Sequence, residues 1–437
     1  ISSSDVDNFS PGTLLAANWT ADSYNSASSN YDKSHSLSTR HTLTFVPHFN
    51  NESHKLNIFA RYEFSSGSSS SQALGKKWLP TSEDITSTLA GGVLSNLSTG
   101  AYEWKNQAAF FQAHYSYKGK YSVTGTFRLD GSTRFGKERR WGKFGGISAR
   151  WNITDEPWME KVKWLSMLSI RPSWGVTGSA PTAEGLYYSK YSTGAAYMGV
   201  TSVIPSNIRL NGLRWETLTE YNIGTDFGFF NNKLSGDLCV YWKTTDDLFN
   251  SNYGISASSG YGSLSTRNSG SMRNQGWEFN LNGNEIIKIG KKFAVDFNIT
   301  FANNRNKILD MDETVLKVMN SEFDYSNGSY LSRVQINNPL GAIYGFRCLG
   351  VYQYTDYSEV EVPGVSGPDA PVVTNENGEV VYDATGKPKH MYFNYGNATT
   401  AGRQYTFVGG DAKYEDVNHD GSIDELDIVY LGSTLPK

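Results

Sequence analysis

The stretch YSVTGTFRLD, residues 121–130, alternates strictly between two kinds of side chain. One parity holds the apolar or small residues Tyr121, Val123, Gly125, Phe127 and Leu129. The other parity holds the polar residues Ser122, Thr124, Thr126, Arg128 and Asp130. Because successive side chains of a strand point to opposite faces, this stretch predicts a β-strand with one apolar face and one polar face.

Two environments suit such a strand. In a soluble sheet the apolar face packs on the core and the polar face meets water. In a transmembrane β-barrel the apolar face meets lipid and the polar face lines an aqueous lumen. The strand alone does not distinguish the two, so the rest of the chain has to decide.

The alternation recurs along the chain. Ten strands of about ten residues, the length that spans a membrane when tilted, are expected at residues 40–49, 55–64, 106–118, 121–130, 144–153, 165–175, 220–230, 234–247, 276–284 and 293–303. Residues 1–39 form a weakly patterned segment, with a strand expected at Leu14–Trp19.

The connections between these strands alternate in length. Short turns are expected near residues 50–54, 119–120, 155–163, 231–233 and 285–292. Long loops are expected at residues 65–105, 131–143, 177–219, 248–275 and from 304 onward. Outer-membrane barrels combine short periplasmic turns with long outer loops, whereas a soluble sandwich has no reason to keep every long loop at one end. We therefore predict an all-β, antiparallel up-and-down transmembrane meander over residues 40–303, followed by a long extracellular region over residues 304–437.

Composition agrees with a barrel. The 437 residues include 27 Tyr and 11 Trp, which suits aromatic girdles at membrane interfaces, although it also suits sugar-binding sheets. A mean hydropathy of -0.46 and the lack of any apolar run of 18 residues exclude membrane-spanning helices. The net charge of -4 argues against general nucleic-acid binding. The two cysteines are too few for a disulfide framework.

Catalytic motifs do not emerge from the sequence. The seven histidines lack H-E-x-x-H spacing, and no G-x-S-x-G elbow occurs. The stretch GSTRFGK, residues 131–137, nearly matches a P-loop, but Glu138 stands where a Ser or Thr must hold magnesium. Four carboxylates on the polar parity are explained by a polar lumen: Asp130, Asp226, Glu278 and Asp296. We predict that the chain is not an enzyme, and that the basic loop after Asp130 is a solvated outer loop or contacts lipid phosphates.

The sharpest motif is DVNHDGSIDELD, residues 416–427, which matches the spacing of a calcium-binding loop. Calcium is a hard cation that needs several oxygen ligands, and Gly421 permits the sharp turn at the sixth position. The expected metal-binding residues are Asp416, Asn418, Asp420, Ser422 through its carbonyl, Asp424 through a water, and Asp427. The alternative is an acidic turn without a metal.

Tryptophans supply the candidate substrate contacts. Four of them fall in or next to expected loops: Trp78, Trp104, Trp141 and Trp215. Indole rings stack on sugar rings, but they also form interface girdles and pack loops. We treat the four as candidate substrate-binding residues.

Six segments, in this order, resemble one known family. They are RLDGSTRFGKERRWGKFGGISARWNITDEPWM (128–159), RPSWGVTGS (171–179), ETLTEYNIGTDFGFFNNKLSGDLCVYWKTTDDL (216–248), RNQGWEFNLNG (273–283), GAIYGFRCLGVYQ (341–353) and GDAKYEDVNHDGSIDELDIVYLGSTLPK (410–437). From about residue 100 onward the chain resembles the SusC/RagA-like TonB-dependent transporters of Bacteroidota outer membranes.

The resemblance implies a 22-strand barrel with an N-terminal plug in the outer membrane of a Gram-negative bacterium. It also implies a SusD-like surface lipoprotein as a lid, energy from TonB, and import of oligosaccharides or peptides. The plug and the closing strands are expected outside this chain. The alternatives are a siderophore or cobalamin receptor on the same barrel, and a surface carbohydrate-binding β protein.

The parity of the connections also places the calcium-loop motif. The strand at residues 293–303 is expected to run outward, so residues 416–427 should lie outside the cell, where millimolar calcium would fill even a weak site. We expect the ion to make rigid the outer loop that docks the lipoprotein lid.

Overall fold

A computed structural model describes residues 2–10, 26–79, 92–198, 200–254, 258, 261, 263–289, 293–320, 331–332, 334–352, 372–373, 375, 377–387, 389–394, 404–407 and 410–434. The chain divides into two compact units, Ile1–Asn303 and Asn304–Lys437. The α-helix α1 (Glu313–Met319) has seven residues. Within the described ranges, no helix has both the length and the apolar character needed to cross a membrane.

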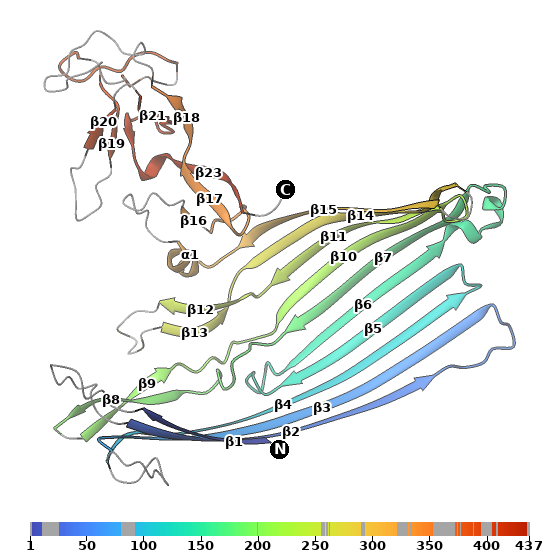
Figure 1. Cartoon of the computed structure of the whole chain (residues 1–437), viewed down its shortest axis with the longest axis horizontal. Coiled ribbons are helices and arrows are strands. Elements are labelled where there is room, and N and C mark those ends of the chain that lie inside the picture. Colours follow the sequence, from blue (N-terminus) through green and yellow to red (C-terminus); the bar gives the residue numbers. More distant parts are fainter. Residues whose placement is uncertain are drawn as a thin grey trace. The chain divides into compact units, whose positions relative to one another are not determined.

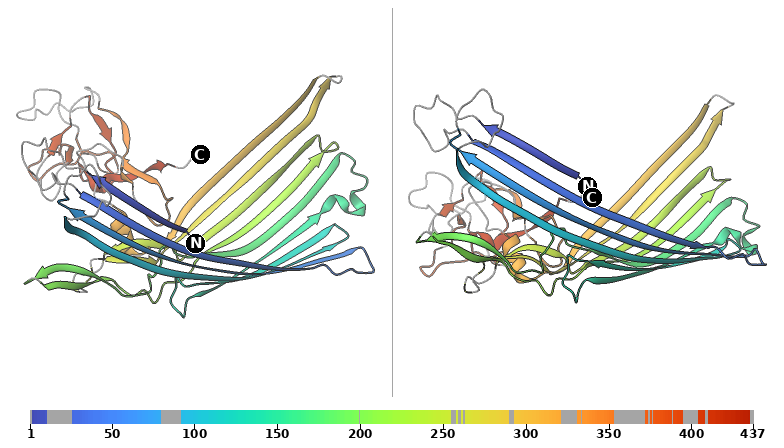
Figure 2. Two further views of the ribbon diagram at one scale, coloured as in Figure 1. Left: turned by 60° about the horizontal axis from the view of Figure 1, so that its bottom comes forward. Right: turned by 90° about the horizontal axis from the view of Figure 1, so that it is seen from below.

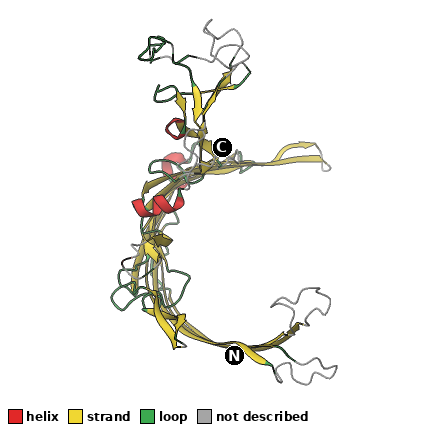
Figure 3. Cartoon of the chain, turned by 90° about the vertical axis from the view of Figure 1, so that its left-hand side faces the viewer, coloured by secondary structure: helices red, strands yellow, loops and turns green. Residues whose placement is uncertain are grey.

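Unit 1 is built on one antiparallel sheet of eleven strands, ordered β1-β2-β3-β4-β5-β6-β7-β10-β11-β14-β15 (Figure 1). The strands are β1 (Ser2–Ser10), β2 (Ser26–Phe45), β3 (His54–Lys77), β4 (Val93–Tyr117), β5 (Tyr121–Ser132), β6 (Trp141–Asn152), β7 (Leu165–Ser179), β10 (Glu216–Phe229), β11 (Leu234–Asp246), β14 (Ser271–Ile289) and β15 (Phe293–Asp310). Figure 3 shows that these strands follow one curved wall. The sheet is therefore the up-and-down meander that the sequence predicts.

Two hairpins lie in the long connections of the sheet. Strands β8 (Lys190–Tyr197) and β9 (Val200–Asn207) pair between β7 and β10. Strands β12 (Phe249–Gly254) and β13 (Ser263–Asn268) pair between β11 and β14. The loops expected around residues 177–219 and 248–275 therefore carry strands of their own.

Among the described residues of unit 1, no second sheet covers the apolar face of the large sheet. Phe127 is 48% exposed and Trp151 is 38% exposed, and Phe297 is half-buried. Other large apolar side chains on this face are also exposed: Val123, Ile147, Trp174, Tyr221, Ile223 and Trp242. In a soluble sandwich these residues would form the core between two sheets. Their exposure in this chain does not fit that alternative, and it agrees with a face that meets lipid.

The prediction of a long loop at residues 65–105 is wrong. Strand β3 continues to Lys77 and β4 begins at Val93, with an antiparallel ladder from Ser65↔Asn106 to Lys77↔Val93. Figure 2 shows these long strands running on beside β2. The run SSGSSSSQ, residues 65–72, has little apolar character on either face, so a hydrophobicity pattern cannot reveal its strand. The backbone ladder forms nonetheless, because it requires only N–H and C=O groups.

Strands also begin earlier than residue 40. Strand β1 and most of β2 lie within residues 1–39, and β2 pairs with β3 over its whole length. The weakly patterned segment thus adds a strand to the sheet. The strand expected at Leu14–Trp19 lies outside the described residues.

The described residues of unit 2 form three small sheets. They are made of β16 (Leu331–Ser332), β17 (Ala342–Phe346) and β23 (Ile428–Ser433); β18 (Cys348–Val351) and β21 (Ala412–Tyr414); and β20 (Gln404–Thr406), β19 (Tyr392–Asn394) and β22 (Ser422–Ile423). A core of Tyr352, Phe407 and Ile423 holds the last of these sheets. The region from residue 304 onward, expected as an extended loop, therefore has packed structure of its own.

An aromatic cluster marks the short-turn end of the apolar face. The rings of Tyr121 and Trp151 stack with centroids 6.4 Å apart. Glu156, in the short connection after β6, accepts hydrogen bonds from the Tyr121 hydroxyl and from Trp151 Nε1 at 3.1 Å. The hydrogen bond from Tyr121, followed by that from Trp151, lowers the pKa of the Glu156 carboxyl. Aromatic side chains with one polar end are typical of a membrane–water interface.

Candidate functional site

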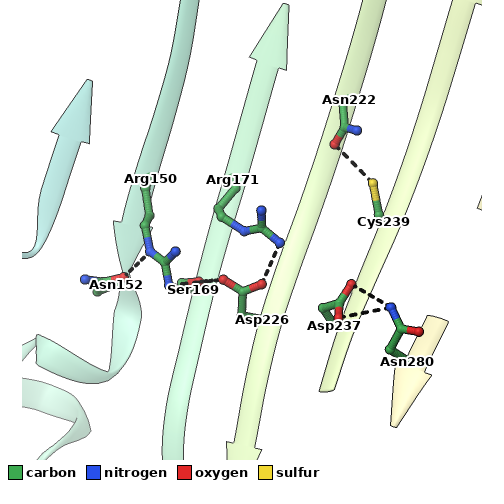
Figure 4. Close-up of polar contacts among 9 residues, drawn as sticks. All are labelled: Arg150, Asn152, Ser169, Arg171, Asn222, Asp226, Asp237, Cys239 and Asn280. Atoms are coloured by element: carbon green, nitrogen blue, oxygen red, sulfur yellow. Dashed lines mark hydrogen bonds and ion pairs between the residues drawn. The ribbon is translucent and has the colours of Figure 1, made fainter. Parts of the chain in front are cut away.

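A cluster of ion pairs lies on the polar face of β6, β7 and β10 (Figure 4). Arg171 Nη2 lies 2.6 Å from Asp226 Oδ1, and Arg150 Nη2 lies 3.0 Å from Asp226 Oδ2. The Ser169 hydroxyl donates a hydrogen bond to Asp226 Oδ2 at 2.8 Å. Two guanidinium groups therefore share one carboxylate, and the cluster keeps a net positive charge.

The register of the sheet explains this cluster. Asp226 stands opposite Ser169, and Gly224 stands opposite Arg171. A Cβ atom at Gly224 would lie 3.2 Å from Arg171 Nη2, so the glycine leaves room for the guanidinium to reach across the strand pair. The arrangement depends on cross-strand neighbours that are more than fifty residues apart in the sequence.

A row of amide side chains continues the polar face across β10, β11, β14 and β15. Asn280 Nδ2 donates to Asp237 Oδ1 at 3.2 Å and Thr300 Oγ1 donates to Asn280 Oδ1 at 2.9 Å. Cys239 Sγ donates to Asn222 Oδ1 at 3.3 Å. Asn298 and Asn282 are also hydrogen-bonded. Uncharged donors and acceptors of this kind can exchange hydrogen bonds with a hydrated, polar solute.

A polar pocket of about 300 Å³ opens on the same face towards the long-loop end of β2 to β5. Arg128 donates two hydrogen bonds to the Asp130 carboxylate, of 2.7 and 2.9 Å. Arg40 Nε lies 2.9 Å from Glu63 Oε1. Trp215 closes one side of the pocket. The pocket combines fixed charges, held by their partners, with an aromatic edge.

The structure does not bring the four candidate tryptophans together. Trp104 lies on the polar face, with its ring against Gly67, where a Cβ atom would be 2.6 Å from Nε1. Trp141 lies on the apolar face, with its ring against Gly131. Trp215 packs on Phe135 and Phe144, with ring centroids 4.8 and 5.6 Å away. Trp78 is exposed just beyond the end of β3. Trp104 and Trp215 are thus the two that adjoin the polar face.

The sequence placed Arg128 and four carboxylates on the polar parity, but it did not predict the ion pairs between arginines and carboxylates on this face. A signal was available, because Arg128, Arg150 and Arg171 all fall on the polar parity of their strands. Paired opposite charges on one parity are what a polar wall requires when its charges are partly buried.

Residues 416–427 form a compact acidic loop. Asp416 Oδ2 accepts from the Gly421 N–H at 2.9 Å, and Asp420 Oδ1 accepts from the Ser422 N–H at 2.7 Å. Gly421 has a φ of 85°, a conformation that favours glycine. A Cβ atom there would also lie 2.3 Å from Val373 Cγ2. Ile423, at the eighth position, is fully buried in the core of the sheet formed by β19, β20 and β22.

Asp427 closes the loop. Its carboxylate is fully buried and accepts from the N–H groups of Val417 and Asp424, at 2.8 and 2.9 Å. Burial raises the pKa of the Asp427 carboxyl, and the neighbouring carboxylates of Asp416 and Asp424 raise it further. Negative charge is therefore concentrated around a buried acidic group.

Two buried oxygens of this loop bear on whether it can bind a cation. Asp416 Oδ1 and Ser422 Oγ are buried and have no hydrogen-bond partner. As the side chains stand, no group of three or more His, Cys, Asp or Glu residues in the described ranges converges as a metal site. A calcium loop also uses amide, carbonyl and water oxygens, which Asn418, Ser422 and the ninth position supply. The donors present therefore fit a hard, oxygen-liganded cation.

We expect Asp226→Ala to destabilise the sheet, because it leaves the guanidinium groups of Arg150 and Arg171 facing each other without an anion. The free energy of unfolding should fall by about 1–3 kcal/mol, between the values for exposed and buried pairs, since both arginines remain partly exposed. Urea unfolding of the full-length protein in detergent measures the change. The matched control is Asp237→Ala, which removes a carboxylate that faces an amide. Equal losses in the two variants would contradict the assigned role of the arginines.

The family comparison identifies a barrel. The model of the family described as "TonB dependent receptor-like, beta-barrel" matches residues 2–386. The TonB-dependent receptor P39 of Formosa agariphila is 26% identical over 355 residues, which cover 78% of this chain and 31% of that protein. The TonB-dependent receptor SusC of Bacteroides thetaiotaomicron is 32% identical over 173 residues, which cover 37% of this chain and 17% of that protein. The chain spans about a third or less of the length of these curated relatives.

Solved structures show the same architecture. The RagAB peptide importer in its closed-closed state aligns with a TM-score of 0.67 and 20% identity, over 93% of this chain and 41% of that chain. Its open-open state aligns with a TM-score of 0.64 and 19% identity, over 89% of this chain and 40% of that chain. At this level of identity the likeness establishes the fold.

Proposed function

The chain belongs to the TonB-dependent receptor β-barrel family, and from that premise we propose that it forms part of the barrel wall of a nutrient importer in the outer membrane of a Gram-negative bacterium. The complete barrel in this proposal has 22 strands and encloses a plug that lies outside this chain. The observation that carries the proposal is the two-faced sheet. Its apolar face is exposed, whereas the arginines Arg40, Arg128 and Arg171 of its polar face are paired with carboxylates.

The polar face is the proposed transport path. A large solute that crosses the outer membrane needs a wall that offers hydrogen bonds without holding the solute tightly. The amide row, the ion pairs around Asp226 and the polar pocket beside Arg128 supply such a wall. Trp104 and Trp215 adjoin this path and can stack on sugar rings or contact peptide side chains. We propose oligosaccharides or peptides as the substrate class, and transport rather than catalysis as the activity.

We propose two partners for the complete receptor. A SusD-like surface lipoprotein would cover its outer opening, and TonB would supply the energy for import. Strand β15 starts after a short connection and runs to the long-loop end of the sheet, so the chain leaves the sheet at that end. We therefore propose that residues 304–437 are extracellular and available to the lipoprotein.

We also propose that residues 416–427 bind calcium. Asp416, Asn418, Asp420 and Asp427 would hold the ion with their side chains, Ser422 with its carbonyl and Asp424 through a water. The buried oxygen Asp416 Oδ1, which has no hydrogen-bond partner, supports this proposal. Bound calcium would neutralise the carboxylates that crowd around Asp427.

A two-step purification of the full-length protein tests the proposed function. The protein should stay in the membrane after washes with high salt and sodium carbonate, and it should enter solution only with detergent. A soluble or surface-attached carbohydrate-binding protein would be released by the washes. Affinity purification from detergent should then recover a lipid-anchored partner in about equal amount. A protein that is extracted by detergent but purifies alone would instead favour a siderophore or cobalamin receptor.

A further inference from the structure

Four cations gather where the apolar face ends, at the long-loop side of β4, β5 and β6. Lys143 of β6 stands opposite Leu129, the last large apolar residue of β5. Lys105 lies on the apolar parity of β4, two residues before Gln107, which stands opposite Gly131. Lys137 and Arg139 lie in the turn that joins β5 to β6. All four side chains are exposed, and we refer to these residues as the rim cations.

The rim cations differ from the paired arginines of the polar face in having no anionic partner. On the polar face, Arg40, Arg128 and Arg171 each form an ion pair of 2.6–2.9 Å. Within the described part of the chain, no ion pair engages any rim cation. Their nearest acidic neighbours in sequence are Glu103, on the same parity as Lys105, and Glu138 in the turn. The rim therefore keeps a net positive charge that the chain itself does not neutralise.

The depth of the rim matches the headgroup layer of a membrane. The aromatic cluster at Tyr121 and the position of Gly131 are ten residues apart on β5. At ~3.4 Å per residue and a tilt of about 40°, this stretch covers roughly 26 Å along the membrane normal, close to the height of an apolar barrel band. Trp141 is half exposed, and its ring packs against Gly131. It lies at the long-loop end of the apolar band, where interfacial aromatic residues are typical of a barrel.

We propose that the rim cations bind the phosphate groups of anionic lipids in the outer leaflet. This inference rests on the proposed outer-membrane location. The ammonium groups of lysine act as point charges towards phosphate, and the guanidinium of Arg139 can offer two parallel hydrogen bonds. Four cations without partners, at headgroup depth and directly above a lipid-facing stripe, provide both the charge and the position for this contact. The lipid phosphates would complete the charge balance that acidic side chains provide on the polar face.

Native mass spectrometry of the full-length receptor tests the proposal. The receptor is released from detergent micelles that contain either diphosphorylated lipid A or phosphatidylethanolamine at the same mole fraction. We expect adducts of lipid A to predominate. In the variant K105Q/R139Q/K143Q the affinity for lipid A should fall roughly 100-fold, because each basic residue near an anionic surface contributes about 1 kcal/mol.

The matched control is K118Q/K161Q/K163Q, which removes three exposed lysines at the short-turn end of the sheet. It should retain lipid A as the unmodified receptor does. Equal losses in both variants, or no preference for lipid A in the unmodified receptor, would overturn the proposal. Displacement of lipid A by inorganic phosphate at equal concentration would assign the rim to free anions and would overturn it as well. Release of the receptor by carbonate would instead contradict the membrane location itself, so the two failures can be told apart.

Discussion

Phe127→Arg should destabilise the inserted barrel by about 2–4 kcal/mol, the cost of an arginine on the lipid face near the middle of a membrane. Phe127 lies in the middle of β5, on the apolar face, and it is 48% exposed in the protein alone. In the membrane that exposed area would contact acyl chains, so the substitution puts a guanidinium into hydrocarbon. Urea unfolding of the full-length receptor in lipid vesicles measures the change in free energy. The yield of heat-modifiable, folded protein in the outer membrane should fall with it.

Thr126→Arg is the matched control for this prediction. Thr126 precedes Phe127 at nearly the same depth, but its side chain lies on the polar face and bonds to the Gly146 carbonyl at 3.3 Å. An arginine there would enter an aqueous lumen that already holds Arg128 and Arg150. We expect a loss of less than about 1 kcal/mol, as for most solvated surface substitutions. If both variants lose the same stability, or if Phe127→Arg loses none, the assignment of the two faces is wrong.

The sequence predicts the sheet wherever one face is apolar, and its limits follow from the same cause. Strand β5 is readable because apolar side chains must alternate to face lipid. The outward continuation of β3 beyond Ser65 carries hydroxyl groups on both faces, so no alternation marks it. Its register comes from hydrogen bonds to β2 and β4, which are not encoded as a local pattern. The small sheets of unit 2 are not predicted for another reason. Their strands have only two to six residues, too few for an alternating pattern to be recognised.

The candidate sites divide in a similar way. The acidic loop is local, so the spacing of Asp416, Asp420 and Asp427 is enough to predict where the turn and its oxygens lie. The cluster around Asp226 is not local, because Arg150 and Arg171 reach it across two strand pairs. Its existence depends on register, which a single sequence leaves open. The tryptophans show the same limit, since whether Trp104 and Trp141 lie on the polar or the apolar face follows from strand parity within segments that look like loops.

Calcium removal should loosen the acidic loop of unit 2 while the barrel stays folded. If calcium is present at 100 times its dissociation constant, the ion stabilises the loop by about 2.7 kcal/mol, and a chelator removes that contribution. The carboxylates of Asp416 and Asp424 would then face the buried Asp427 without a cation between them. Limited proteolysis should show faster cleavage within residues 410–430 after chelation, and binding of the proposed lipoprotein partner should weaken.

The variant D416A/D420A separates ion binding from a general effect of the chelator. It removes two proposed ligands, so its loop should be cleaved quickly both with and without calcium. The matched control D383A removes an aspartate whose turn is closed by the Thr385 and Lys387 N–H groups, at 2.8 and 3.0 Å, and which needs no ion. This control should keep the calcium response of the unmodified protein. Cleavage of residues 410–430 at the same rate with and without chelator in the unmodified protein would sink the calcium proposal, because a bound ligand stabilises the state that binds it.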